Sequence, residues 1–139
     1  MMHLDLSRPT AQPRYQHLRL FFIIACVSYV TVLGFFSLTP SVPGPANLSD
    51  KALHFIAYGG LTGLLGLALP QSRLGLLFVL ASAIGLALEC AQGYFPVGRV
   101  MSMSDQAANM GGVMLAISAW IAIAATRKQP SKTENLSQL

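Results

Sequence analysis

The first group of residues suited to chemistry combines a carboxylate, a cation, an imidazole and a phenol. Asp50, His54 and Tyr58 follow one another at intervals of four residues, and Lys51 lies beside Asp50. On an α-helix, side chains at this spacing drift by only about 80° around the axis over the two steps, so they form one polar stripe. Groups of these types bind polar ligands, transfer protons and coordinate metals.

Two further polar groups lie downstream in the chain. Glu89 and Gln92 are three residues apart near the end of one apolar run, and Asp105 and Asn109 are four residues apart at the start of the next. Each pair falls on one helix face, and Arg99 lies in the connection between them. If these runs are antiparallel helices, all three groups meet at the same end of the bundle.

Glu89 is the strongest functional candidate because its neighbours on both sides are apolar. An ionised carboxylate in hydrocarbon is costly unless it is paired or hydrated, so Glu89 must face the bundle interior, water or a cation. The available cations are Arg99, His54 and Lys51. An intramembrane ionisable group of this kind indicates a functional site by default.

Helix capping is a structural alternative for several of these residues. Ser49 or Asp50 can cap one helix, and Ser102-x-x-Asp105 has the form of a capping box for another, in which Ser104 is a further candidate cap. Carboxylates near a helix start also suit the helix macrodipole.

Packing and ion pairing are structural alternatives for the rest. Lys51 can extend to the membrane interface, and Tyr58 and His54 can serve as packed side chains with satisfied hydrogen bonds. A Glu89–Arg99 ion pair that holds the connecting loop is the strongest structural alternative for both of those residues.

Composition predicts that helices in a membrane position these residues. Of the 139 residues, 53% are hydrophobic and 10% are charged, whereas a soluble domain carries about 25% charged residues. A membrane-spanning helix needs about 20 apolar residues. The predicted spans are residues 18–38, 51–69, 74–92 and 106–126. The first run exceeds the apolar core of about 7–15 residues in a signal peptide, so we expect a retained helix.

The distribution of basic residues predicts the orientation. Seven of the nine lie on the side that carries both termini and the 70–73 connection, and Lys51 and Arg99 lie on the other side. The seven are Arg8, Arg14, Arg19, Arg73, Arg127, Lys128 and Lys132. The positive-inside rule therefore predicts an all-α integral membrane bundle of four transmembrane helices, N-in/C-in. Residues 1–17 form a cytoplasmic arm, residues 127–139 form a disordered cytoplasmic tail, and loops 39–50 and 93–104 lie outside.

Small residues four positions apart predict close helix packing. Such spacing lets helix backbones approach each other in lipid, although packing without function is its ordinary meaning. The pairs are Gly59 and Gly63, Ala81 and Gly85, Ala107 and Gly111, and Ala108 and Gly112.

Two blocks of the chain resemble the VanZ-like family of bacterial membrane proteins. The first block is Asp50-Lys51-x-x-His54-Phe55-x-x-Tyr58-x-x-Leu61. The second is Glu89-x-x-Gln92, followed by Gly98-Arg99, Asp105, Asn109 and Gly112. The resemblance covers residues 50–112 and departs at Ala116, where the family usually has another glycine. It implies a VanZ-like domain over residues 18–126 in the bacterial inner membrane. The name-giving member is similar to an accessory factor that lowers sensitivity to a lipoglycopeptide antibiotic, and no settled molecular activity comes with the family.

We expect a binding or accessory function for an outward-facing polar pocket. Lysine and arginine suit the phosphate of an anionic lipid or an envelope-precursor headgroup, and amides and carboxylates suit its sugar or peptide. The expected ligand-binding residues are Asp50, Lys51, His54, Tyr58, Glu89, Gln92, Arg99, Asp105 and Asn109.

Three alternatives stay open. One is a membrane enzyme in which Glu89, His54 and Asp105 act as acid, base or metal ligands. No recognisable nucleophile or metal motif supports it, so we expect neither a metal nor a cofactor. The others are a small transporter, which polar groups confined to one half disfavour, and a purely structural ion-paired bundle. The bilayer is the expected partner and nucleic acid is not, because the basic residues flank apolar runs. The oligomeric state stays open.

Overall fold

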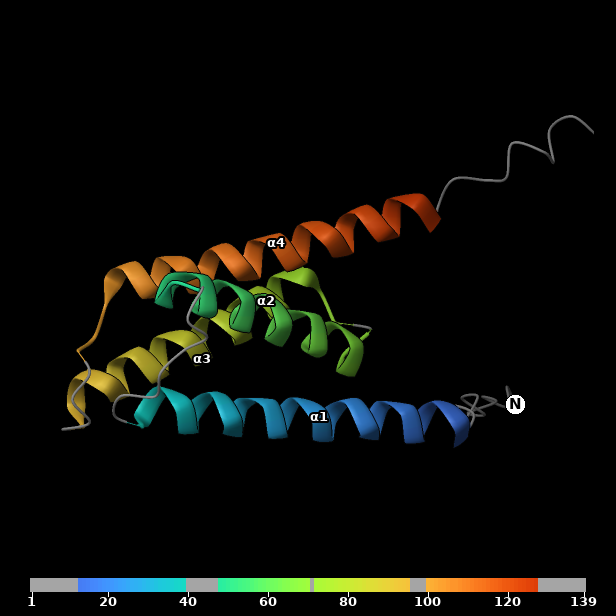
Figure 1. The fold of residues 1–139 in the computed structure, drawn as a ribbon. Helices are drawn as coiled ribbons and strands as arrows, with labels where there is room; N and C mark the ends of the chain where they lie inside the picture. Colours follow the sequence, from blue (N-terminus) through green and yellow to red (C-terminus); the bar gives the residue numbers. More distant parts are fainter. Residues whose placement is uncertain (1–12, 40–47, 71, 96–99, 128–139) are drawn as a thin grey trace, which may run out of the picture.

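Four α-helices make up the part of the protein that the computed structural model describes, residues 13–39, 48–70, 72–95 and 100–127, and this part contains no strand. The helices are α1 (Pro13–Leu38), α2 (Asp50–Ala68), α3 (Leu74–Tyr94) and α4 (Met103–Arg127) (Figure 1). Each predicted segment coincides with one helix to within a few residues. The all-α prediction is therefore confirmed.

The helix starts follow local sequence signals. α1 begins at Pro13, five residues before the predicted span, and proline suits the first helical position because its missing N–H has no helical partner there. Ser49 caps α2, since its Oγ accepts the N–H of Ala52 at 3.2 Å. The Oγ of Ser102 likewise accepts the N–H of Asp105 at 3.2 Å just before α4. A serine therefore caps each of the two helices, α2 and α4, that carry candidate site residues in their first turns.

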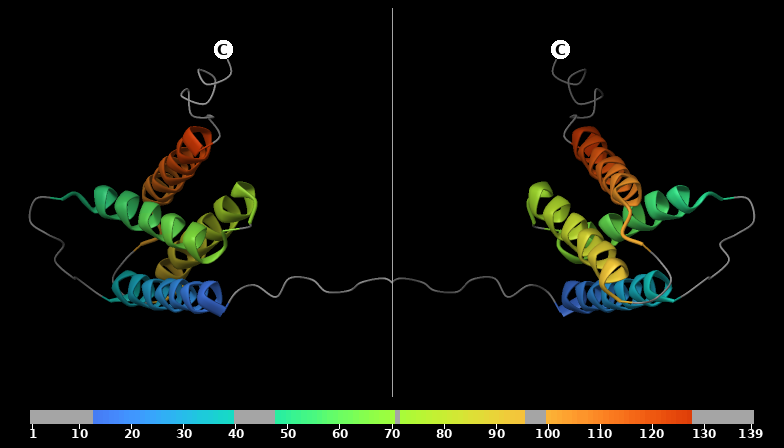
Figure 2. Two further views of the ribbon diagram at one scale, coloured as in Figure 1. Left: turned by 90° about the vertical axis from the view of Figure 1, so that its right-hand side faces the viewer. Right: turned by 90° about the vertical axis from the view of Figure 1, so that its left-hand side faces the viewer.

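The helices form three layers, in which α2 and α3 lie between α1 and α4 (Figures 1 and 2). α1 and α3 end, and α2 and α4 begin, at the same end of the bundle (Figure 1). We call this the polar end, because Asp50, Glu89 and Asp105 all lie near it. The antiparallel order of the helices thus brings together groups that are far apart in the sequence.

The closest packing in the bundle is the crossing of α2 and α4. A Cβ added to Gly112 would overlap the carbonyl oxygen of Phe55 and lie 2.9 Å from the backbone nitrogen of Gly59. The two backbones therefore touch, as small residues allow in lipid. Gly63, the other glycine of the predicted pair on α2, has nothing within 4 Å of where its Cβ would lie. Of this pair, Gly59 therefore lies at the crossing and Gly63 does not.

Side chains from α1 and α4 make further contacts with α2. The hydroxyl of Tyr29 on α1 donates to the carbonyl of Ala57 at 3.0 Å. On the opposite side, the indole of Trp120 on α4 covers Gly66, where a Cβ would lie 2.6 Å from the ring. α2 therefore packs against α1, α3 and α4, while Ile56 on its remaining face stays exposed.

Within the described part of the chain, three helices are long and apolar enough to cross a membrane, over Gln16–Leu38, Leu74–Tyr94 and Met103–Thr126. Large apolar side chains such as Phe21, Phe35 and Met114 are more than half exposed on their outer faces. Exposure of this kind suits contact with lipid and not with water. α2 does not meet the same criterion, because its first two turns carry Asp50, Lys51 and His54.

Candidate functional site

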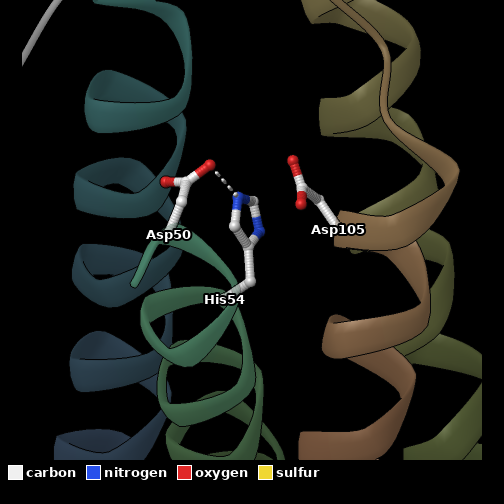
Figure 3. Close-up of side chains that lie close together, drawn as sticks. All are labelled: Asp50, His54 and Asp105. Carbon is white, nitrogen blue, oxygen red and sulfur yellow. Dashed lines mark ion pairs between the residues drawn. The ribbon is translucent and has the colours of Figure 1, made fainter. Parts of the chain in front are cut away.

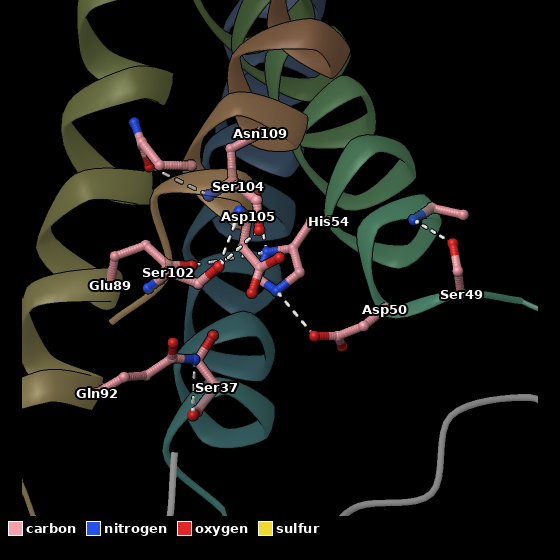
Figure 4. Close-up of polar contacts among 12 residues, drawn as sticks. Ser37, Ser49, Asp50, His54, Glu89, Gln92, Ser102, Ser104, Asp105 and Asn109 are labelled. Atoms are coloured by element: carbon pink, nitrogen blue, oxygen red, sulfur yellow. Dashed lines mark hydrogen bonds and ion pairs between the residues drawn. The ribbon is translucent and has the colours of Figure 1, made fainter. Parts of the chain in front are cut away.

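Three polar side chains from three helices converge at the polar end. The Nδ1 of His54 on α2 lies 2.9 Å from the Oδ1 of Asn109 on α4 and 3.9 Å from the Oε1 of Glu89 on α3 (Figure 4). Glu89 is 2% exposed and Asn109 is fully buried. The predicted meeting of the three polar groups is therefore confirmed for these residues.

Glu89 makes one of the two hydrogen bonds of the capping box at the start of α4. In such a box, the acidic residue three positions after the cap normally accepts the N–H of the capping residue. Here the Oε2 of Glu89 accepts the N–H of Ser102 at 3.0 Å. The carboxylate of Asp105, which holds the box position, turns toward His54 instead (Figure 3). Glu89 thus ties α3 to α4 and leaves Asp105 for other contacts.

A chain of hydrogen bonds orients His54. The Nδ2 of Asn109 donates to the Oε1 of Gln106 at 3.2 Å, so the amide oxygen of Asn109 faces the imidazole. An amide oxygen only accepts, so this contact is a hydrogen bond in the tautomer of His54 that carries its proton on Nδ1. Gly85 on α3 provides the space for this chain, since a Cβ there would lie 3.2 Å from both Asn109 and Gln106.

Two carboxylates, one from α2 and one from α4, lie near the imidazole of His54 (Figure 3). The Oδ2 of Asp50 lies 4.0 Å from the Nε2 of His54, a distance too long for a hydrogen bond (Figure 3). One ligand atom from each of Asp50, His54 and Asp105 lies within 4.8 Å of the others. The side chain of Asp50 is 56% exposed and that of His54 is 12% exposed. This group therefore reaches from the bundle interior to its surface.

Three more predicted site residues that the structure describes, Tyr58, Gln92 and Lys51, lie outside this group. Tyr58 belongs to the hydrophobic core at 3% exposure. Gln92 donates to the carbonyl of Ser37 at 3.0 Å and so ties α3 to the end of α1 (Figure 4). Lys51 is exposed on the first turn of α2. Arg99, and with it the predicted Glu89–Arg99 pair, lies outside the described residues.

Two contributors to the site were missing from the sequence-based set. Gln106 fixes the amide of Asn109, and the backbone N–H of Ser102 binds Glu89. The spacing of Gln106 and Asn109, three residues apart on one helix, is a signal that indicates such a pair. A backbone N–H carries no sequence signal of its own, so the second contact required the structure.

No protein-family model, curated protein or solved structure matches the chain. The chemistry therefore has to be argued from the arrangement itself, which has two layers. In the inner layer, Glu89 and Asn109 are buried and hydrogen-bonded to neighbouring helices. In the outer layer, which we call the rim, Asp50, Lys51 and Asp105 keep part of their surface exposed. The inner layer fixes the relative positions of α2, α3 and α4 at this end, and the rim offers the side chains that a ligand can contact.

Proposed function

We propose that the protein is a VanZ-like protein of the bacterial inner membrane whose rim binds the headgroup of an envelope lipid or a lipid-linked precursor. The observation that carries the proposal is the division of the polar end into a self-paired inner layer and an exposed rim. The rim residues lie on the first turns of α2 and α4, and the hydrogen bonds of the inner layer hold these turns in place. A polar surface at the end of a membrane bundle lies at the depth where headgroups lie.

The charges of the rim narrow the kind of headgroup. Lys51 suits a phosphate oxygen, whereas Asp50 and Asp105 suit hydrogen-bond donors such as an amine or sugar hydroxyls. Among the rim residues that the structure describes, a purely anionic headgroup would meet two carboxylates beside one lysine. The rim therefore favours a headgroup that combines a phosphate with donor groups.

The same proposal includes the topology. Both termini lie in the cytoplasm, the polar end faces outward, and α2 is the fourth membrane-spanning helix. The excess of basic residues at the opposite end supports this orientation. The 19 residues of α2 make a helix of about 28 Å, close to the hydrocarbon thickness of about 30 Å. Its polar first turns would lie at the outer interface.

Lipid binding by the purified full-length protein tests the headgroup proposal. Native mass spectrometry would compare phosphatidylglycerol, phosphatidylethanolamine and a polyprenyl phosphate as probes. Lys51→Ala should weaken binding of the preferred lipid by about tenfold or more, because a hydrogen bond to a charged group contributes about 1.5–3 kcal/mol and 1.4 kcal/mol is a factor of ten.

Arg73→Ala is the matched control, because Arg73 is also exposed but lies at the opposite end of the bundle. It should leave the affinity at the rim unchanged. Equal losses in the two variants would indicate general attraction to anionic lipid. Unchanged binding of all three lipids in Lys51→Ala would refute the headgroup proposal.

A further inference from the structure

We infer that Asp50, His54 and Asp105 form a binding site for one divalent transition-metal ion, Zn²⁺ or Mn²⁺, at the polar end. The inference goes beyond the headgroup proposal, because the ligand is the ion alone and no lipid is required. It also departs from the favoured sequence-based expectation, which had no metal; the enzyme alternative named Glu89, His54 and Asp105 as possible metal ligands, and the structure brings Asp50, not Glu89, into a set with the other two. The spacing within each helix did not indicate that Asp105 would lie beside the pair on α2.

The positions of the donor atoms suit a single ion. The three ligand atoms lie within 4.8 Å of one another, and the two on α2 are 4.0 Å apart. Zinc binds imidazole nitrogen at about 2.0–2.1 Å and carboxylate oxygen at about 2.0–2.2 Å, so two ligands of one ion lie no more than about 4.4 Å apart. The 4.0 Å between Asp50 and His54 lies within that limit, and the set as a whole exceeds it by at most about 0.4 Å.

The orientation of the His54 imidazole suits coordination of a metal ion. When the Nδ1 proton is donated to Asn109, Nε2 keeps its lone pair, and the carboxylate of Asp50 lies 4.0 Å from it. A histidine ligand almost always donates its other ring N–H in this way, and the contact fixes both the tautomer and the ring orientation. Gln106 supports Asn109 in turn, so the orienting contact is itself fixed.

The charges and the coordination number also match. Two carboxylates and a neutral imidazole carry a total charge of −2, which balances a divalent cation. Nitrogen and oxygen donors suit zinc, and a set rich in carboxylate suits manganese. Three protein ligands leave at least one coordination position open to water or to a phosphate oxygen. Asp105 is able to serve because Glu89 supplies the capping contact that an acidic residue at its position normally makes.

A metal titration of the purified full-length protein tests the site. The protein would be treated with a chelator, transferred to chelator-free detergent, and titrated with Zn²⁺, Mn²⁺ or Mg²⁺ alone. Elemental analysis after dialysis should find one zinc or manganese ion per chain. Asp50→Asn and His54→Gln should each weaken binding by more than about 100-fold, because removal of even an outer-sphere partner costs about 10–100-fold.

Matched variants separate the site from incidental binding. His17→Gln removes an exposed histidine near the start of α1 and should leave the stoichiometry and affinity unchanged. Asp50 is mostly exposed, so its variant also guards against loss of binding through unfolding. Visible absorption of the Co²⁺ complex should change in His54→Gln and stay the same in His17→Gln.

The outcomes also distinguish this site from headgroup binding. Lys51→Ala should keep the bound ion even where it loses lipid. Absence of stoichiometric Zn²⁺ and Mn²⁺ in the folded protein would overturn the inference, and so would equal affinities in the wild-type protein and Asp50→Asn. In that case lipid binding would still be judged by its own experiment.

Discussion

Replacement of Glu89 provides the sharpest test of how the polar end is held together. The carboxylate is 2% exposed, and its Oε2 accepts the N–H of Ser102 at 3.0 Å. A hydrogen bond to a charged acceptor contributes about 1.5–3 kcal/mol, and an unfilled space left by truncation adds to the loss. Relief from burying a charge offsets part of this. We expect Glu89→Ala to lower the free energy of unfolding by about 2–4 kcal/mol.

Glu89→Gln separates the hydrogen bond from the charge. The amide oxygen of glutamine can accept the same N–H, so we expect a loss of only about 1 kcal/mol. The free energy of unfolding would be measured by titration with sodium dodecyl sulfate in mixed micelles, followed by circular dichroism. Cys90→Ala, at the exposed position next to Glu89, should change it by less than about 0.5 kcal/mol. If Glu89→Ala is as stable as the wild-type protein, or if the two Glu89 variants lose equal stability, the capping role assigned to this carboxylate is wrong.

The helix crossing and the serine cap give two further predictions, and both are measured as free energies of unfolding by the same titration. Gly112→Ala should lower the free energy of unfolding by about 3 kcal/mol, the upper part of the range for overpacking, because the new Cβ meets the backbone of Phe55. Gly63→Ala, at an open position, should lower it little, and similar losses in the two variants would contradict the crossing. Ser102→Ala should lower it by about 1 kcal/mol through loss of the cap, and Ser104→Ala should lower it less. The reverse order would place the cap elsewhere.

The sequence carried enough information to predict the helices and the end at which the polar groups meet. Apolar runs of about 20 residues predict helices in lipid, and alternating direction along the chain places Asp50, Glu89 and Asp105 at one end. The boundaries were less accurate, since α1 starts at Pro13. Whether α2 crosses the membrane stays a prediction, because its polar first turns reduce its apolar character.

The partners within the site could not be predicted, because spacing gives a face of a helix but not its rotation toward a neighbour. The stripe of Asp50, His54 and Tyr58 illustrates the point. Its drift of about 80° is enough to place Tyr58 in the core while His54 faces Asn109 on α4. Glu89 was expected to face the bundle interior, water or a cation; it is buried and lies 3.9 Å from His54, but its hydrogen bond to the backbone N–H of Ser102 was not predicted.

The position of α2 explains how a polar helix is accommodated in this bundle. Its polar stripe would be costly against lipid, and the part of the stripe that runs into the bundle faces other helices, since His54 is 12% exposed and contacts Asn109 on α4. The close approach of Gly112 to the carbonyl of Phe55 lies one residue from His54. A displacement of the backbone there must move the imidazole relative to Asn109 and Asp105. We therefore expect Gly112→Ala to weaken metal binding as well as stability, although Gly112 contributes no ligand atom. Unchanged metal affinity in a destabilised Gly112→Ala protein would show that the site is independent of the crossing.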